Sequence, residues 1–497
     1  MAYLVWKHSG KNRYLVMRWK KRINGVPTIV KEISIGSVEN LAKIVEGDLK
    51  DIVLKSYNFG VTAAVIIMDR KISLRNIVNS VLNHHDTGMS PGDYVLLFIM
   101  NRLSDPKSKS GIERWMSSDY ASTIYPKRGS QDFWNMMDGF TDTDMRNIMN
   151  QIRDKLISLG YDFSRIFVDA SNMYTFMDEN DMAKKGHNKK QRYDLNQISY
   201  YIAANYDYIP LYGEAYPGNV HDSKTFESII KNIPDNSTVI FDRGYNSKSN
   251  IELLHDRKYI GALIQSDHKD LIKLNIEKDS FIETSKNVYG KDHRIIVYHS
   301  SVLEKKRVIT FMKRFKKVYV KAKRIIETGD SDAMEKARLY LEQEKLNETI
   351  ELPSMAINSE RMDERFNMFG KNAIFTNISD MKGEEIIDLY RKRNRVEHCF
   401  RTINTMDIAF PLYHWTTQKI SVHMFFSHIA YLFLALIYNE VREFQKDVSP
   451  IRTTEYLKDI KLNYAARGKR VVEKIECKSQ VSETINKVMK LESIVRD

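Results

Sequence analysis

The sequence predicts an α/β protein built from several domains. Between residues 161 and 265, short apolar runs rich in β-branched residues alternate with helix-like segments, which is the pattern of a layered sheet-and-helix domain. A chain of 497 residues is too long for one hydrophobic core, so two to four domains are expected. Hydrophobic residues make up 42% of the chain, which is ordinary for a folded protein.

Two modules are predicted before the α/β domain. Residues 1–85 are expected to form a small mixed module rich in β-structure, because residues 14–18 and 28–34 alternate apolar and polar side chains beside turn signals such as Asn24-Gly25. Residues 86–160 are expected to be helical, because their apolar residues recur every three or four positions. A DNA-binding domain and a helical spacer would both give this pattern.

The α/β domain is predicted in two parts, separated by an insertion. The first part covers residues 161–265, with helices expected after Asp222 and Ser247. Its expected strands are residues 166–169, 198–204, 210–215, 239–242 and 260–264. The second part covers residues 371–440 and begins with an expected strand at 372–378. Residues 266–370 are an inserted subdomain, because this gap is too long for one connection. Residues 441–497 form a charged tail with a helical pattern.

The insertion contains the most basic run of the chain. Residues 305–324 hold ten Lys or Arg and no acid, interleaved with aromatic and aliphatic side chains. This alternation predicts strands with one face on a core and the other toward nucleic-acid phosphates, so the insertion is expected to be β-rich. The candidate DNA-binding residues in the run are Lys313, Arg314, Lys316 and Lys317. The alternative is a solvent-exposed face balanced by the acidic residues of 327–351.

Three carboxylates indicate a magnesium site that works on nucleic acid. Asp169 and Asp242 each end a strand-like apolar run, while Glu397 lies in a basic helical segment where an isolated acid would repel the ligand that its neighbours attract. Divalent cations such as Mg²⁺ prefer carboxylate oxygens, and a pair of them can stabilise both oxygens of a phosphoryl transfer. Singly, each acid is better explained as a turn, a cap or a helical salt bridge. Only the three together indicate the site.

Spacing adds candidates around Glu397. Tyr390, Arg393, Glu397 and Arg401 are three or four residues apart, so they would share one face of a single helix. Guanidinium groups on that face could hold the phosphates of a DNA strand through paired hydrogen bonds.

Taken in order, these motifs resemble the DDE transposases of insertion sequences, in the group named insertion sequence family four. The motifs are Phe167-Val168-Asp169-Ala170-Ser171-Asn172, Pro217-Gly218-Asn219-Val220-His221-Asp222-Ser223-Lys224-Thr225, Asp242-Arg243-Gly244-Tyr245, the spaced set Tyr390, Arg393 and Glu397, and Pro411-Leu412-Tyr413-His414 with the later His423. The resemblance runs from about residue 167 to residue 438. The chain departs from it at Asn404, where the family signature has a lysine.

The resemblance implies a ribonuclease H-like fold, in which Asp169, Asp242 and Glu397 bind two Mg²⁺ ions and Mn²⁺ can substitute. The implied reaction is cleavage at the terminal inverted repeats of an element, followed by joining of the 3′-hydroxyls to target DNA. The implied partners are double-stranded DNA, both element ends and target, and a second copy of the chain in a synaptic homodimer. By the same resemblance, Tyr390 and Arg393 would contact the DNA strand at the cleavage site. Arg401 and Arg243 are further candidate DNA-binding residues.

Composition is consistent with this expectation. Lys and Arg number 77 against 64 Asp and Glu, and the net charge of +13 favours polyanion binding. The two cysteines, Cys399 and Cys477, have no metal-ligand pairing near them, so neither a zinc finger nor a disulfide framework organises the chain. No signal peptide or membrane-spanning segment is expected, because the longest apolar stretch, residues 424–438, is too short. A cytoplasmic, nucleoid-associated protein that needs no membrane is therefore expected.

Three other classes stay open on the sequence. A structure-specific nuclease of the same fold would share the three acids but lack strand transfer. A catalytically impaired or domesticated DNA-binding regulator is favoured by Asn404 and opposed by the three intact acids. A ribonuclease H relative that acts on RNA is the least supported, because the chain is far longer than the stand-alone enzyme.

Overall fold

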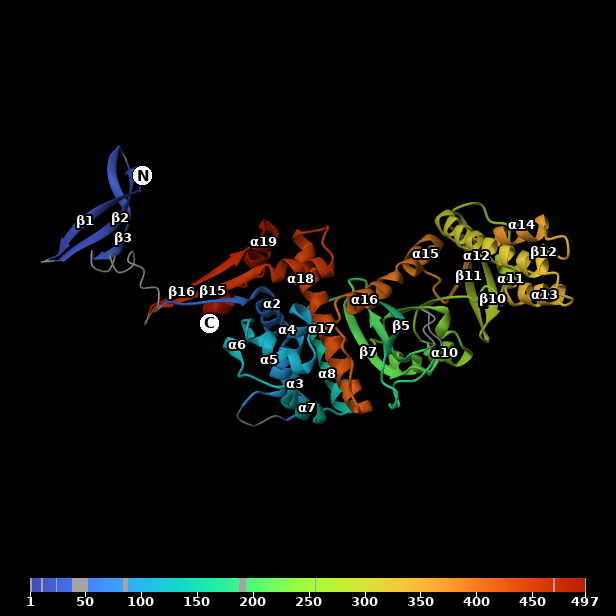
Figure 1. Ribbon diagram of the computed structural model, residues 1–497, viewed down its shortest axis with the longest axis horizontal. Coiled ribbons are helices and arrows are strands. Elements are labelled where there is room, and N and C mark those ends of the chain that lie inside the picture. Colours follow the sequence, from blue (N-terminus) through green and yellow to red (C-terminus); the bar gives the residue numbers. More distant parts are fainter. Residues whose placement is uncertain are drawn as a thin grey trace.

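The computed structural model describes residues 2–9, 12–23, 25–37, 52–83, 88–186, 194–254, 256–467 and 470–496. Figure 1 shows an elongated molecule in which a small N-terminal sheet, a helical domain and a large mixed sheet follow one another. The large sheet has eight strands in the order β10-β11-β14-β9-β8-β5-β6-β7. This arrangement confirms the predicted α/β class.

The N-terminal sheet contains three antiparallel strands. They are β1 (Ala2–Ser9), β2 (Asn12–Ile23) and β3 (Val26–Ser37). The strands predicted at 14–18 and 28–34 lie within β2 and β3. Several large apolar side chains on this sheet are exposed, including Leu4, Trp6 and Val30.

A second small sheet joins the two ends of the chain. Strand β4 (Ile52–Asn58) pairs with β15 (Ile460–Arg467), and β15 pairs with β16 (Arg470–Cys477). The helices around it are α18 (Pro450–Lys458), α19 (Gln480–Val488) and α20 (Ser493–Arg496). The prediction of a helical tail at 441–497 is therefore wrong for the strand residues. The reason is that Leu462 and Ile475 face the core across the hairpin, so alternation outweighs the high charge.

The helical domain confirms the helices predicted in residues 86–160. It contains α4 (Pro91–Ser104), α5 (Ile112–Met116), α6 (Ala121–Ile124), α7 (Ser130–Asp138) and α8 (Asp142–Ser158). Two earlier helices, α2 (Gly60–Ile72) and α3 (Leu74–Val81), pack on α4 although they lie inside residues 1–85. The β-structure of that segment thus ends at Asn58.

Helix α17 (Thr417–Phe444) connects the helical domain to the large sheet. It packs on α4 and on the edge strand β7, and it contains the longest apolar stretch of the chain, residues 424–438, which is buried. By length and composition the helix could cross a membrane, but 94% of its most apolar window is buried inside the protein. His428 is buried, and its Nδ1 lies 2.5 Å from the hydroxyl of Tyr200 on the sheet.

The first half of the large sheet holds the strands predicted between residues 161 and 265. They are β5 (Arg165–Thr175), β6 (Asn196–Ala204), β7 (Pro210–Pro217), β8 (Thr238–Phe241) and β9 (Tyr259–Ala262). The connecting helices are the 3₁₀ turn η3 (Asp222–Thr225), α9 (Phe226–Asn232), the 3₁₀ turn η4 (Arg243–Tyr245), α10 (Lys248–Leu253) and α11 (Lys269–Ile272). Strands β5, β6 and β7 are antiparallel neighbours, whereas β8 runs parallel to both β5 and β9.

The second half of the sheet is antiparallel. Strands β10 (Phe281–Val288), β11 (Lys291–His299) and β14 (Lys371–Thr376) continue the sheet from β9. Strand β14 confirms the strand predicted at 372–378.

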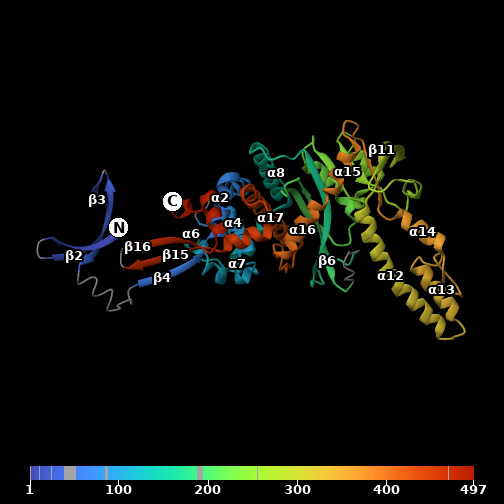
Figure 2. The ribbon, with the colours of Figure 1, turned by 90° about the horizontal axis from the view of Figure 1, so that it is seen from above.

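The rest of the insertion is helical, which corrects the prediction of a β-rich insertion. It contains α12 (Ser301–Glu327), α13 (Ala333–Gln343), α14 (Ser359–Met368) and a two-residue pairing of β12 (Ile350–Glu351) with β13 (Ala356–Ile357). Helices α12 and α13 project from the sheet (Figure 2).

The basic run at 305–324 lies within α12, so the predicted strands are wrong there. The reason is that Phe311, Phe315, Val318 and Ala322 recur every three or four residues and pack in a small core of the insertion's own. Long unbranched lysine and arginine side chains also favour a helix.

A buried polar cluster links the helical domain to α17. Lys109, in the 3₁₀ turn η2 (Lys109–Gly111), has its Nζ 2.9 Å from His414 Nε2 and 3.1 Å from His423 Nδ1. The guanidinium of the equally buried Arg102 donates to the carbonyl oxygen of Phe410. Within the described residues, neither cation forms an ion pair with a carboxylate. Burial lowers the pKa of Lys109 to about 7 and the pKa of His414 to about 3.

Replacing Lys109 with methionine should remove part of the pH dependence of stability. Because the pKa of Lys109 in the folded protein lies near 7, below its ordinary value of 10.5, the unfolded chain holds an extra proton between those values. The free energy of unfolding should then rise with pH in this window, by at most about 1.4 kcal/mol per pH unit. Unfolding midpoints from pH 7 to 9.5 measure this slope.

The control for this measurement is Lys107→Met, because Lys107 is half-exposed. The Lys107 variant should keep the wild-type slope, whereas Lys109→Met should flatten it. Equal slopes in all three proteins would mean that Lys109 stays protonated in the folded state.

Candidate active site

The parallel pairing of β5 and β8 brings the two aspartates together. In the register of this pair, Val168 lies opposite Phe241, so Asp169 and Asp242 follow at the same level on neighbouring strands. The register is locked by two apolar runs, residues 166–168 and 239–241, which are fully buried. Asp242 leaves β8 directly into the turn η4, whereas β5 continues beyond Asp169 as a long hairpin with β6.

The third acid comes from a helix that packs on β5. Glu397 lies in the first turn of α16 (Asn394–Thr405), whose buried face includes Val396 and Ile403. The prediction of one continuous helix face is wrong here. Helix α15 (Gly383–Arg391) ends before Arg393, and the amides of the next residues bond to oxygens three positions back, which tightens the chain into a turn.

The two arginines beside this break are held by different partners. Arg395, in the first turn of α16, donates to the carbonyl oxygen of Tyr206 at 2.7 Å, and its guanidinium lies 3.6 Å from the centre of the Tyr206 ring. Arg393 turns instead toward the acids. The two arginines are therefore held by different partners on either side of the α16 start.

The guanidinium of Arg393 contacts all three acids. Its Nη1 lies 3.0 Å from Asp169 Oδ2, while its Nη2 lies 3.2 Å from Glu397 Oε1 and 3.9 Å from Asp242 Oδ2. The exposed fraction of the acid side chains rises from 7% at Asp169 through 33% at Asp242 to 50% at Glu397. The site is therefore buried at Asp169 on β5 and open to solvent at Glu397 on α16.

Electrostatics hold Arg393 in its charged form. Burial by itself lowers the pKa of Arg393, since its side chain is only 16% exposed. The charges of Asp242 and Asp169 outweigh this effect, so the pKa is raised above its ordinary value. Tyr390, at the end of α15, lies near enough to Asp242 that burial and this negative charge both raise the pKa of its phenol.

Two further cations, Arg243 and Arg307, share one hydrogen-bond acceptor on β14. Arg243 donates from Nη2 to Asn372 Oδ1 at 3.1 Å, and Arg307 donates from Nη2 to the same oxygen at 3.2 Å. Burial and the nearby charge of Arg243 lower the pKa of Arg307. The sequence analysis named Arg243 but missed Arg307, because its place beside β14 depends on how α12 leaves the sheet.

The remaining predicted residues lie on α16 and on α12. Arg401, one turn after Glu397, is exposed and forms no ion pair within the described residues. On α12, Lys313, Lys316 and Lys317 are exposed. Arg314 is instead paired with Glu344 at 2.7 Å. The alternative for this run was a solvent-exposed face balanced by the acidic residues of 327–351. Within the described residues, Arg314 is the only one of these four basic residues that pairs with such an acid.

A fourth acid near the site was not singled out by the sequence analysis. Asp222 Oδ1 accepts a 2.6 Å hydrogen bond from the hydroxyl of Tyr216, and the charges of Asp222 and Asp169 both raise the pKa of that phenol, after burial. Asp222 and Ala170 line one cleft along β5. The motif at residues 217–225 contains Asp222 and is the sequence signal that could have identified this acid.

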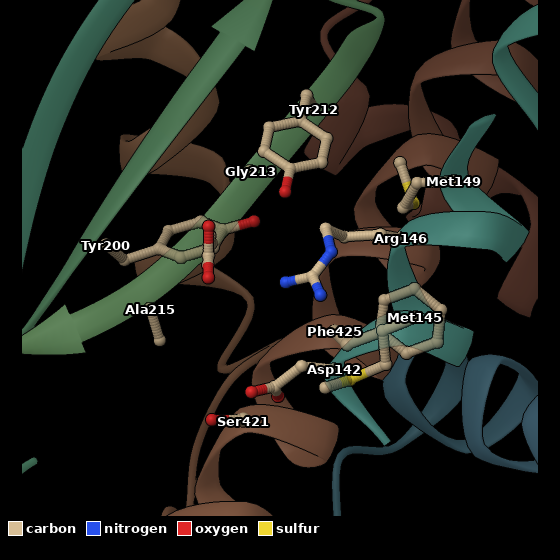
Figure 3. A pocket seen from close by; sticks show the side chains of 11 residues that line it. Asp142, Met145, Arg146, Met149, Tyr200, Tyr212, Gly213, Ala215, Ser421 and Phe425 are labelled. Carbon is tan, nitrogen blue, oxygen red and sulfur yellow. The ribbon is translucent and has the colours of Figure 1, made fainter. Parts of the chain in front are cut away.

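A separate pocket lies where α8 and α17 meet the edge strand β7. Figure 3 shows the guanidinium of Arg146 in this pocket, facing Tyr212 and Gly213. None of the predicted site residues lines it.

The donor set of the three acids suits a divalent cation. Carboxylate oxygens are the ligands that Mg²⁺ and Mn²⁺ prefer, and a positive group already lies among them in the form of Arg393. As the side chains stand, no three His, Cys, Asp or Glu residues in the described part of the chain are placed to hold a metal ion. The chemistry of the site fits a metal, but the guanidinium of Arg393 lies among the three acids.

A family model described as a transposase DDE domain matches residues 160–433 of the chain. The chain belongs to the DDE transposase family. The match begins just before β5 and ends within α17, so it includes the three acids of the site.

Similarity to two curated proteins adds no functional argument. Probable polyketide synthases 24 and 25 of Dictyostelium discoideum are each 26% identical to this transposase, over 211 and 201 residues. These segments cover 37% and 35% of the transposase. The transposase spans only 8% of the length of either relative.

Loss of the individual acids should destabilise the transposase unequally. Asp169→Asn removes the charge of the most buried acid in the site, so we expect it to lower the free energy of unfolding by roughly 1–3 kcal/mol. Glu397→Gln should have a much smaller effect, because half of that side chain is exposed to solvent. Thermal midpoints of the metal-free proteins measure the difference. Equal midpoints would show that the Asp169–Arg393 contact contributes nothing in solution.

Proposed function

We propose that this transposase acts on an insertion sequence of the family four type. It binds the terminal inverted repeats as double-stranded DNA, cleaves at the element ends and joins the 3′-hydroxyls to target DNA, working as a homodimer at the nucleoid in the cytoplasm. The observation that carries the proposal is the meeting of Asp169, Asp242 and Glu397 around one guanidinium, within the segment that matches the family model.

The three acids would hold two Mg²⁺ ions, or Mn²⁺ in their place. When bound, such ions activate an attacking water or hydroxyl group and stabilise the leaving oxygen of a phosphoryl transfer. Asp169 would provide the fixed ligand, because it is buried at the centre of the sheet. Glu397 is half-exposed and would complete the site from the side where DNA arrives.

Basic side chains around the acids would hold the DNA strand. Arg393, Tyr390 and Arg243 lie closest to the acids and would position the phosphates at the cleavage site. Arg401 would supply the positive charge that the lysine of the family signature provides and Asn404 does not. Lys392 is the other candidate for that role, but its Nζ is engaged 2.5 Å from Asp388 Oδ2.

The first experiment tests catalysis. Asp169→Asn, Asp242→Asn and Glu397→Gln should each abolish cleavage of a DNA end in Mg²⁺ or Mn²⁺, because removing one ligand costs several kcal/mol of charge stabilisation. Binding of the same DNA should persist. Asp447→Asn, at an exposed acid in the segment before α18, is the matched control.

The outcome of this assay separates the possible classes. Cleavage by any of the three variants at the wild-type rate would remove that residue from the site. Cleavage by the wild type without joining to a target plasmid would identify a structure-specific nuclease. Binding without cleavage by the wild type would identify a regulator.

A second experiment tests whether α12 binds DNA. Replacing Lys313, Lys316 and Lys317 with glutamine should weaken the salt dependence of binding, by about 0.9 in the log–log slope for each phosphate that the helix no longer neutralises. Arg314→Gln should change the slope less, because Arg314 is already paired with Glu344. Lys336→Gln on α13, where the lysine pairs with Asp332, is the control. An unchanged slope in the triple variant would place this face of α12 away from DNA.

A further inference from the structure

The space between the three acids is occupied by a residue of the same chain. Arg393 donates to Asp169 and to Glu397, and it lies within ion-pair distance of Asp242. Its side chain is 16% exposed, so it is partly enclosed by the acids. A guanidinium in this position already satisfies oxygen atoms that a divalent cation would need.

We propose that Arg393 is an internal counter-ion that competes with metal ions for the three acids and gives up this position to DNA. This inference rests on the proposed two-metal function. In the DNA-free protein, the positive charge of Arg393 holds the negative side chains together and opposes the entry of a second positive charge. A DNA phosphate then accepts the guanidinium, and the acids become free to bind metal ions.

The competition follows from charge and geometry. Mg²⁺ binds oxygen ligands at about 2.0–2.1 Å and would therefore meet the guanidinium, which is only 3.0 Å from Asp169 Oδ2. Two positive groups so close in a partly buried site repel strongly, because the effective dielectric constant there is well below that of water. The absence of a metal-ready cluster among the described side chains agrees with this geometry.

The release of Arg393 also has a structural basis. Arg393 lies in the tight turn between α15 and α16, at the N-cap of α16 rather than inside either helix. Glu397, its most exposed partner, lies on the open side of the site. A phosphate can accept two parallel hydrogen bonds from a guanidinium, which matches the strongest contacts that Arg393 makes with the acids.

Such an exchange would link metal binding to DNA binding. By thermodynamic linkage, DNA that removes Arg393 from the acids raises their affinity for metal, and bound metal raises the affinity for DNA by the same factor. The consequence is that the full set of metal ions assembles only on a DNA-bound transposase.

The test is calorimetric titration of Mn²⁺ into wild type, Arg393→Gln and Arg393→Lys, each with and without a short DNA carrying an element end. Without DNA, Arg393→Gln should bind Mn²⁺ at least tenfold more tightly than the wild type. Arg393→Lys keeps the positive charge and should stay close to the wild type. DNA should tighten Mn²⁺ binding by the wild type, and this effect should be mostly absent in Arg393→Gln.

Arg391→Gln is the control, because Arg391 lies one residue outside the turn and its guanidinium lies over the ring of Tyr298. Thermal midpoints provide a second measurement. Metal-free Arg393→Gln should melt below the wild type, since three acids lose their shared cation, and saturating Mn²⁺ should raise its midpoint more than it raises that of the wild type.

The outcomes separate the two proposals. If Arg393→Gln binds Mn²⁺ no more tightly than the wild type without DNA, while Glu397→Gln loses Mn²⁺ binding, the metal site stands and the counter-ion role of Arg393 is overturned. If none of the proteins binds Mn²⁺ with or without DNA, the proposed two-metal function itself fails.

Discussion

The parallel pairing of β5 with β8 is the constraint on which the candidate site depends. Asp169 and Asp242 are distant in the sequence, and only this register sets them side by side. A slip of one residue would turn Asp242 to the opposite face of the sheet and expose the buried run that precedes it. The third acid depends on the same sheet, because Val396 and Ile403 fix α16 against it.

The large insertion leaves this arrangement undisturbed. Strand β11 ends at His299 and β14 begins at Lys371, and these two residues face each other in the sheet. Everything between them, from α12 to α14, therefore begins and ends at the same end of two neighbouring strands and packs in a core of its own. Such an insertion can vary in length without moving the acids. Its exposed lysines include those of α12, a helix that Figure 2 shows projecting from the sheet.

The sequence was informative where the signal was local. Short apolar runs ending in an acid identified β5 and β8, and both acids lie in the candidate site. The prediction of strands failed in α12, because its many lysines obscured the helical spacing of Phe311, Phe315 and Val318. The pairing of β4 with β15 could not be predicted locally, since it joins opposite ends of the chain. The position of Arg393 requires β5, β8 and α16 to meet, which no single motif encodes.

The charge balance of the site favours the binding of a further cation. Three carboxylates surround one guanidinium, so two negative charges are left in excess in a partly buried space. Burying like charges together is costly, and the nearby Arg243 and Arg307 are both engaged by Asn372. An arrangement built only for stability would have no reason to keep this excess. It is the arrangement expected of a site that is completed by positive charge from outside the chain, and Arg393 maintains it until that charge arrives.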